Sequence, residues 1–336
     1  APQYHIACAG SLLGIALAKP SSFPVGKVNF MQIDPMTFTE FLLANGDENL
    51  VKYLESVDTL DPIPDAFFNP LYEKLKMYYV TGGMPESVKM WTEARDVSAM
   101  QEALSDIIGA YERDFAKHPN LTEFPKISMI WKSVPSQLAR ENKKFIYKVV
   151  KESARAREYE DALQWLVDAR LVHKIYRSSA PGLPVAAYDD LSAFKLYLVD
   201  VGLLRRLAQL APTAFGEGNR LFTEFKGALT ENYVLQTLIT QFEVLPRYWS
   251  QNNPPYEVDF LIQRDNDIFP VEVKSEANLA SKSLRKFKEL FPDKVKLRVR
   301  FSLDNLKLDD DVLNIPLFMA DQADRLIGLA LEHKHG

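Results

Sequence analysis

Residues 257–274 constrain the fold of this chain more than any other stretch, because two alternating apolar runs flank a short polar turn there. Alternation with a period of two is typical of half-buried strands, and the polar residues 264–267 favour a turn. The apolar positions are Val258, Phe260 and Ile262 in the first run and Phe269, Val271 and Val273 in the second. Both runs must turn their apolar side to one core, which sets the register of the predicted hairpin.

Charged side chains lie on the other face of the predicted hairpin. Pairing Val258 with Val273 places Asp259 opposite Glu272, with Lys274 one diagonal step away. Two carboxylates on one side of a sheet repel each other unless a cation lies between them, and oxygen ligands suit Mg²⁺ or Mn²⁺. The Val273 carbonyl adds a third oxygen, and the lysine can orient an attacking water. This predicts metal-assisted hydrolysis of a phosphodiester; the other interpretation is a surface hairpin with a charged solvent face.

A stretch with helical periodicity, residues 221–240, precedes the hairpin. Its predicted buried stripe consists of Leu221, Phe225, Ala228, Leu235 and Leu238. Glu231 lies close to this stripe, where a carboxylate without a partner is costly. We therefore expect Glu231 to lean over the hairpin and complete the metal cluster.

The order of these residues resembles the PD-(D/E)XK nuclease-like pattern, in which a helix glutamate is followed by a strand aspartate and then by Glu-x-Lys on the next strand. The resemblance implies that Glu231 and Lys274 are catalytic. It also implies that Asp259, Glu272 and the carbonyl of Val273 bind the metal ion. One departure is that a valine, not a proline, precedes the aspartate.

The first 65 residues resemble the late part of the P-loop domain in an uncharacterised AAA-type ATPase family of bacteria and archaea. The matching residues are Gly10-Ser11, Gly26-Lys27, where a lysine replaces the usual arginine, and Pro35–Phe41. The sequence contains no G-x-x-x-x-G-K-[ST] phosphate loop. We therefore expect no ATP hydrolysis or binding by this chain alone, with ATP bound only in a full-length form. The other interpretation is an unrelated small α/β lobe.

The middle of the chain is predicted to be helical and then basic. In residues 66–118, the sequence GGMPESV predicts a helix stop at Gly82-Gly83 and a restart at Pro85, and it resembles the same ATPase family. Residues 121–180 contain twelve Lys and Arg against seven Asp and Glu. Three predicted helices followed by two strands are the plan of a winged-helix domain.

Basic side chains in two places are candidate phosphate contacts. The first set is Lys143, Lys144, Lys148, Lys151, Arg155 and Arg157, and the second, on a strand predicted at residues 294–301, includes Lys296, Arg298 and Arg300. The third predicted helix carries four acids, which oppose its entry into a DNA groove. The middle domain is thus either a DNA contact or a structural, protein-contacting module, and the second set is either a phosphate track or an edge strand charged against aggregation.

Composition limits the compartment and the partners. The net charge is −5, the chain has one cysteine, and no apolar run is long enough to cross a bilayer. The eight acids of residues 31–70 face one lysine, which disfavours nucleic acid there. We expect a cytoplasmic protein with no membrane partner and with DNA or a protein as its partner.

Together these patterns predict an α/β multidomain protein. The predicted units are a P-loop ATPase remnant at 1–65, a helical region at 66–118, a winged-helix-like domain at 119–204 and a PD-(D/E)XK nuclease-like mixed sheet with flanking helices at 205–336. The predicted function is Mg²⁺-dependent phosphodiester hydrolysis or DNA binding. The alternative is a non-catalytic assembly module that binds nucleic acid or protein.

Overall fold

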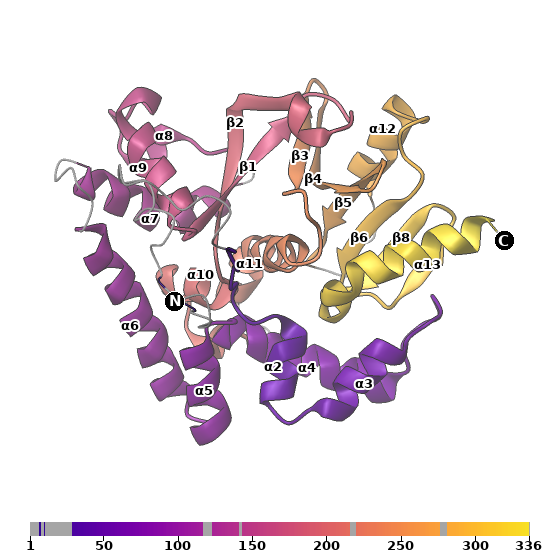
Figure 1. Cartoon of the computed structure of the whole chain (residues 1–336), viewed down its shortest axis with the longest axis horizontal. Coiled ribbons are helices and arrows are strands. Elements are labelled where there is room, and N and C mark those ends of the chain that lie inside the picture. The colour runs from indigo at the N-terminus through magenta and orange to yellow at the C-terminus, as the bar shows by residue number, and fades with distance from the viewer. Residues whose placement is uncertain are drawn as a thin grey trace, which may run out of the picture.

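The computed structural model describes residues 7, 10, 29–116, 123–140, 143–215, 220–275 and 281–335. Within these ranges the chain is mixed α/β, as predicted, with helices packed around an eight-stranded sheet (Figure 1). The predicted matches at Ser11 and Gly26-Lys27 lie outside the described residues.

Helices form the first part of the described chain and lie along one side of the molecule (Figure 1). They are α2 (Phe38–Ala44), α3 (Glu48–Ser56), α4 (Asp65–Thr81), α5 (Pro85–Ala94) and α6 (Val97–Phe115). Helix α4 ends at Gly82, whose φ of +70° needs a residue without a Cβ, and α5 begins with Pro85 at its first position. The predicted helix stop and restart is confirmed.

The basic middle region has the predicted order of three helices and a hairpin. Its elements are α7 (Phe124–Leu138), α8 (Tyr147–Val150), α9 (Ala156–Asp168), β1 (Val172–Ser178), the 3₁₀ turn η1 (Val185–Tyr188) and β2 (Asp189–Leu198). Helices α7 and α9 bury one face each, because their apolar residues recur at helical spacing. Trp131 of α7 is fully buried against the edge of the Phe115 ring.

The central helix of the molecule is α11 (Arg220–Ile239), which follows α10 (Val201–Leu207) and the turn η2 (Pro212–Phe215) (Figure 1). The sequence predicts one apolar stripe on α11, but residues 228–238 are buried on every side. The reason is that β2, β5, α10 and the later turn η3 (Leu317–Gln322) all pack against it. The predicted boundary between residues 204 and 205 falls inside α10.

The remaining elements complete the sheet. They are β3 (Arg247–Asn252), β4 (Pro255–Arg264), β5 (Asp267–Val273), α12 (Lys282–Leu290), β6 (Arg298–Ser302), β7 (Lys307–Asp309), β8 (Val312–Pro316) and α13 (Ala323–His335). The strand order is β2-β1-β3-β4-β5-β6-β8-β7, so the β1–β2 hairpin extends the sheet of the C-terminal region. The strand predicted at 294–301 begins only at Arg298.

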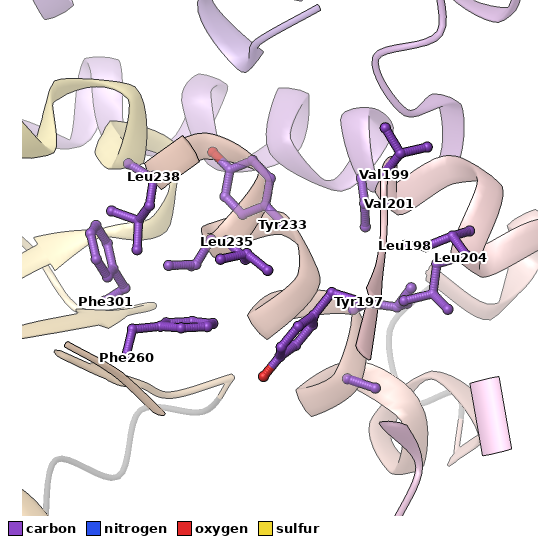
Figure 2. Close-up of a cluster of buried hydrophobic side chains, with 14 of the residues drawn as sticks. Tyr197, Leu198, Val199, Val201, Leu204, Tyr233, Leu235, Leu238, Phe260 and Phe301 are labelled. Carbon is purple, nitrogen blue, oxygen red and sulfur yellow. The ribbon is translucent and has the colours of Figure 1, made fainter. Parts of the chain in front are cut away.

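Two apolar clusters lie on the two sides of the β4–β5 hairpin. The larger cluster runs from α2 to α13 and includes the side of the hairpin that faces α11. Figure 2 shows part of it, with Tyr197 and Phe260 near Leu235 and Phe301. The smaller cluster lies between the sheet and α12, and it consists of Trp249, Val258, Leu261, Ile268, Leu284, Phe287 and Val295. The described parts of the four predicted segments thus contribute to one continuous core.

The described part of the chain contains no helix that combines the length and the apolar character needed to span a bilayer.

Truncating Phe260 tests the importance of the larger cluster. The side chain is 0 % exposed, and its ring centroid lies 5.8 Å from that of Tyr197. We expect Phe260→Ala to lower the free energy of unfolding by about 3–5 kcal/mol, because the substitution leaves a cavity. Leu191→Ala is the control, since Leu191 is 72 % exposed and its truncation is expected to cost no more than about 0.5 kcal/mol. Urea unfolding measures both values, and equal losses would contradict the assignment of Phe260 to the core.

Candidate functional site at the β4–β5 hairpin and helix α11

The β4–β5 hairpin has the register that the sequence predicts. Phe260 pairs with Val271, and the pairing continues to Arg264 and Asp267 at the turn. The ladder stops before it reaches Asp259. There the Asp259 Oδ2 atom accepts a hydrogen bond from the backbone N–H of Val273 at 2.8 Å, so a carboxylate takes the place of a strand carbonyl.

The other edge of β4 contains a β-bulge. Trp249 of β3 pairs with Val258 and Arg247 pairs with Leu261, so the single residue between them on β3, Tyr248, opposes both Asp259 and Phe260. A bulge of this kind inverts the alternation of side chains beyond it.

The bulge changes which side chains share a face. Val258 packs in the smaller cluster beside α12, whereas Phe260 packs in the larger cluster on the α11 side. The prediction that Val258 and Phe260 point the same way is therefore wrong, because alternation within one strand does not reveal an extra residue opposite its neighbour. Asp259, next to Phe260, is turned towards α11.

Six polar side chains gather on the α11 side of the hairpin, and we call them the α11-side polar cluster. They are Lys143, Lys195, Tyr197, Glu231, Glu257 and Asp259. The buried Glu231 carboxylate forms an ion pair with Lys143 and accepts a hydrogen bond from the Tyr197 hydroxyl at 3.0 Å. The Lys195 ammonium, whose side chain is fully buried, donates to Glu257 at 2.5 Å. Glu231 thus approaches the hairpin from a helix, in the position predicted for it.

The charges of the α11-side polar cluster shift one another's pKa values. Burial by itself raises the pKa of Glu231, but Lys143 and Lys195 lower it overall. Burial by itself lowers the pKa of Lys195, but Glu257, Glu231 and Asp259 raise it overall. Burial and the neighbouring Glu231 raise the pKa of Asp259 to about 7, against the opposing effect of Lys195. Two ammonium groups therefore balance two carboxylates, and Asp259 is the acid in excess.

Glu272 lies on the opposite side of the sheet from this cluster. It alternates with Val271 and Val273, which both pack against the larger cluster, so its own side chain emerges towards α12. There its carboxylate accepts a hydrogen bond from the Ser281 hydroxyl and forms an ion pair with Lys274 at 3.0 Å.

Arg300 of β6 completes the surroundings of Glu272. The two residues are register partners in the parallel β5–β6 ladder, and both are buried. Burial lowers the pKa of Arg300, while Glu272 raises it. The Arg300 guanidinium also donates to Asn314 at 2.9 Å. Glu272 and Lys274 therefore share one face, as alternation predicts, but this face is the α12 side and Asp259 is not on it.

The predicted metal ligands Asp259, Glu272 and Val273 do not converge on one point. Asp259 faces Glu231 and Lys195, its Oδ2 atom is held by the Val273 N–H, and both Glu272 oxygens are held by Ser281 and Lys274. Across the described ranges, no three acidic, histidine or cysteine side chains are close enough together to hold a metal ion. The donor set in this arrangement does not fit Mg²⁺ or Mn²⁺, which require several oxygens around one centre.

Several predicted DNA contacts are engaged inside the protein. Lys143 is paired with Glu231, Lys296 with Asp267 at 2.8 Å, and Arg298 with Asp311. The Lys144 side chain is partly buried, and it also interacts with another residue of the chain. The side chains predicted as a phosphate track, Arg298 and Arg300 on β6 and Lys296 just before it, therefore have acidic or amide partners, which is the pattern expected of structural side chains.

The remaining basic residues form an exposed group around α8 and the start of α9. Lys148, Lys151, Arg155 and Arg157 are all exposed. No ion pair is found for any of the four within the described residues. We call these residues the α8–α9 basic group.

Sequence reasoning missed Lys195, Tyr197 and Glu257. One signal was present, because Lys195 lies inside the apolar strand that ends at Leu198, and a buried lysine requires an acidic partner. Its partner Glu257 is 62 residues away, and only the packing of β2 near β4 identifies it.

Two family descriptions match parts of this chain. Residues 72–214 match the domain of unknown function DUF8612, and residues 226–318 match the domain of unknown function DUF4143, which occurs at the C-terminus of AAA-ATPase-associated proteins. The second match is loosely consistent with the resemblance noted above, and the two matches divide the chain between residues 214 and 226. Neither the search of curated proteins nor the search of solved structures found a match.

Asp259→Asn tests the charge balance of the polar cluster. The native pKa of about 7 exceeds the unfolded value, so between these values the native state binds more protons and its stability falls as pH rises. Asparagine keeps the acceptor for the Val273 N–H and removes the excess charge. We expect Asp259→Asn to raise the melting temperature at pH 8 by about 2–4 °C, and to have little effect at pH 5.

The matched control is Asp265→Asn in the turn of the same hairpin. The Asp265 side chain is 83 % exposed, and its φ of 52° suits asparagine equally well. Thermal unfolding of both variants at the two pH values gives the comparison. An unchanged or lower melting temperature of Asp259→Asn at pH 8 would show that Asp259 carries no excess charge.

Proposed function

We propose that this chain is a non-catalytic assembly module of an AAA-type ATPase-associated protein, in which the nuclease-like hairpin is a scaffold. One observation carries this proposal: the β4 bulge turns Asp259 towards α11, while Glu272 and Lys274 lie on the α12 side. The association with an ATPase rests on the DUF4143 match and on the residues of the first 65 positions that resemble such a family. We also propose that residues 205–336 have a PD-(D/E)XK-like topology.

The arrangement of charges supports a scaffold over a hydrolytic centre. A divalent ion at Asp259 and Glu231 would have to compete with the ammonium groups of Lys143 and Lys195. Those two lysines already pair with Glu231 and Glu257, and paired buried ions are costly to separate. Lys274 is held by Glu272 on the other side and is not positioned beside Asp259.

The exposed surface just before α2 favours a protein over nucleic acid as the partner. Phe30, Met31 and Ile33 precede α2 and are 60 %, 88 % and 85 % exposed. Three large apolar side chains so close together mark a contact surface more often than isolated ones do. The acidic composition of residues 31–70 favours a protein over nucleic acid at this end.

Metal-dependent cleavage is the direct test. We expect plasmid DNA to be cut no faster with this protein and Mg²⁺ or Mn²⁺ than with the Asp259→Ala variant. Millimolar Mn²⁺ should also leave the melting temperature unchanged, because the residues that the structure describes contain no preformed ligand set for it to stabilise. Cleavage that is present in the wild type and lost in Asp259→Ala would overturn the scaffold proposal and establish the hydrolytic one.

A second candidate function, contact with a nucleic-acid backbone, is favoured by the α8–α9 basic group. Its four exposed cations lie within ten residues of sequence, close enough to meet neighbouring phosphates. The four acids of α9 argue against reading of bases by this helix, so any binding would be independent of sequence.

Charge reversal within the α8–α9 basic group tests contact with a nucleic-acid backbone. The double variant Lys148→Glu, Lys151→Glu should weaken duplex DNA binding equally for all sequences and reduce its dependence on salt, because two phosphate contacts are lost. The control is Lys52→Glu, Lys89→Glu, which changes the net charge equally at two exposed lysines on α3 and α5. Fluorescence anisotropy at several salt concentrations gives both slopes. Equal effects of the two double variants would reject the α8–α9 basic group as the contact.

A further inference from the structure

The turn between α4 and α5 is packed against a buried carboxylate. Gly82 has φ +70° and ψ −170°, a conformation almost restricted to glycine, and a Cβ there would lie 2.3 Å from the Asp200 Oδ1 atom. A Cβ on Gly83 would lie 2.1 Å from the Met36 carbonyl oxygen. The two glycines therefore allow the chain before α2, the α4–α5 turn and the start of α10 to meet at one point.

Asp200 accepts hydrogen bonds from three elements at that point. Its fully buried carboxylate accepts from the N–H of Gly83 at 2.6 Å and from the N–H of Leu203, at the start of α10, at 2.8 Å. It also accepts from the Gln236 side chain of α11 at 3.4 Å. Burial raises the pKa of Asp200, and these hydrogen bonds oppose the rise.

The hydrogen bonds close into a ring. The Gln236 amide donates to the Tyr78 hydroxyl at 2.9 Å, and that hydroxyl donates to the Met36 carbonyl at 2.5 Å. The Met36 N–H donates to the Gly83 carbonyl at 2.7 Å, and the Gly83 N–H donates to the Asp200 carboxylate, which closes the ring. One ring thus connects the chain before α2 with α4, the α4–α5 turn, α10 and α11.

The hydrogen-bond ring lies between two features described above, the exposed apolar segment before α2 and helix α11. Upstream of Met36 lies the exposed apolar segment that contains Phe30, Met31 and Ile33. On the other side, Gln236 lies on the same helix as Glu231, about one and a half turns away. The two glycines bring the backbone of the turn into direct contact with the Asp200 carboxylate and the Met36 carbonyl, so we expect a shift at Met36 to displace its neighbours.

We propose that this ring, centred on Asp200, is a conformational latch that transmits displacement of the segment before α2 to α10 and α11. Contact of a partner with residues 30–33 would pull on Met36, and the ring would carry that movement to the helix that holds Glu231. The coupling itself does not depend on the proposed function, because it concerns which parts of the chain move together; its trigger, a partner at residues 30–33, rests on the protein-partner part of that function. The simpler account is that Asp200 only caps the start of α10.

Hydrogen–deuterium exchange of Asp200→Asn separates these accounts. Asparagine keeps the shape, but its NH₂ group faces either the Leu203 N–H or the Gly83 N–H together with the Gln236 amide, so a buried N–H loses its acceptor in either orientation. We expect exchange to be about ten-fold faster at the Met36 amide and in α11 around Gln236, with the β5–β6 ladder unchanged. Faster exchange only at Gly83 and the first turn of α10 would leave Asp200 as a cap, and uniformly faster exchange would show general destabilisation; either result overturns the latch.

A second variant and a control keep the test decisive if Asp200→Asn does not fold. Tyr78→Phe removes the hydroxyl that joins Met36 to Gln236 and keeps the packing of the aromatic side chain. It should therefore accelerate exchange at the Met36 amide and in α11 around Gln236, and leave the Gly83 amide protected. An effect at Met36 without one in α11 would contradict transmission. The control is Asp311→Asn, a buried carboxylate paired with Arg298, whose effect should remain within β6 and β8.

Discussion

Side chains of α11 satisfy backbone groups at the end of β2 and at the start of α10, and the rest of the structure depends on this contact. The Asn232 side chain accepts from the N–H of Leu198 at 2.8 Å and donates to its carbonyl at 3.0 Å, and Gln236 accepts from the N–H of Val201 at 3.0 Å. Unpaired buried backbone groups are costly, so the central helix must keep polar residues on the side that meets β2. These bonds join β2 and the start of α10 to the central helix α11.

The polar residues of α11 belong to two separate sets of contacts. Glu231 completes a buried set of charges with Lys143, Lys195 and Tyr197, whereas Gln236 belongs to the ring around Asp200. Buried charges persist only when they are paired and hydrogen-bonded, which is why both sets draw partners from several elements. Helix α11 therefore links the chain before α2 to the β4–β5 hairpin through side chains that have little freedom to move.

The bulge in β4 decides how the nuclease-like pattern is used. It leaves the order of helix acid, strand acid and Glu-x-Lys intact in the sequence, but it turns Asp259 towards Glu231 and away from Glu272. On the β5 side of β4, where the ladder ends, the Asp259 carboxylate accepts the Val273 N–H, so this backbone group keeps a hydrogen bond. The order of the motif residues thus specifies the hairpin but does not by itself place its acids on one face of the sheet.

The sequence by itself determined the elements that depend on local periodicity: the three middle helices, the stop at Gly82, and the register of the hairpin from Phe260 to Arg264. Local patterns carry this information because neighbouring residues share one backbone conformation. Only the tertiary structure decided the face of Asp259 and the pairing of Lys195 with Glu257. The first depends on β3, which lies outside the hairpin, and the second joins residues 62 positions apart, so neither leaves a signal within one strand.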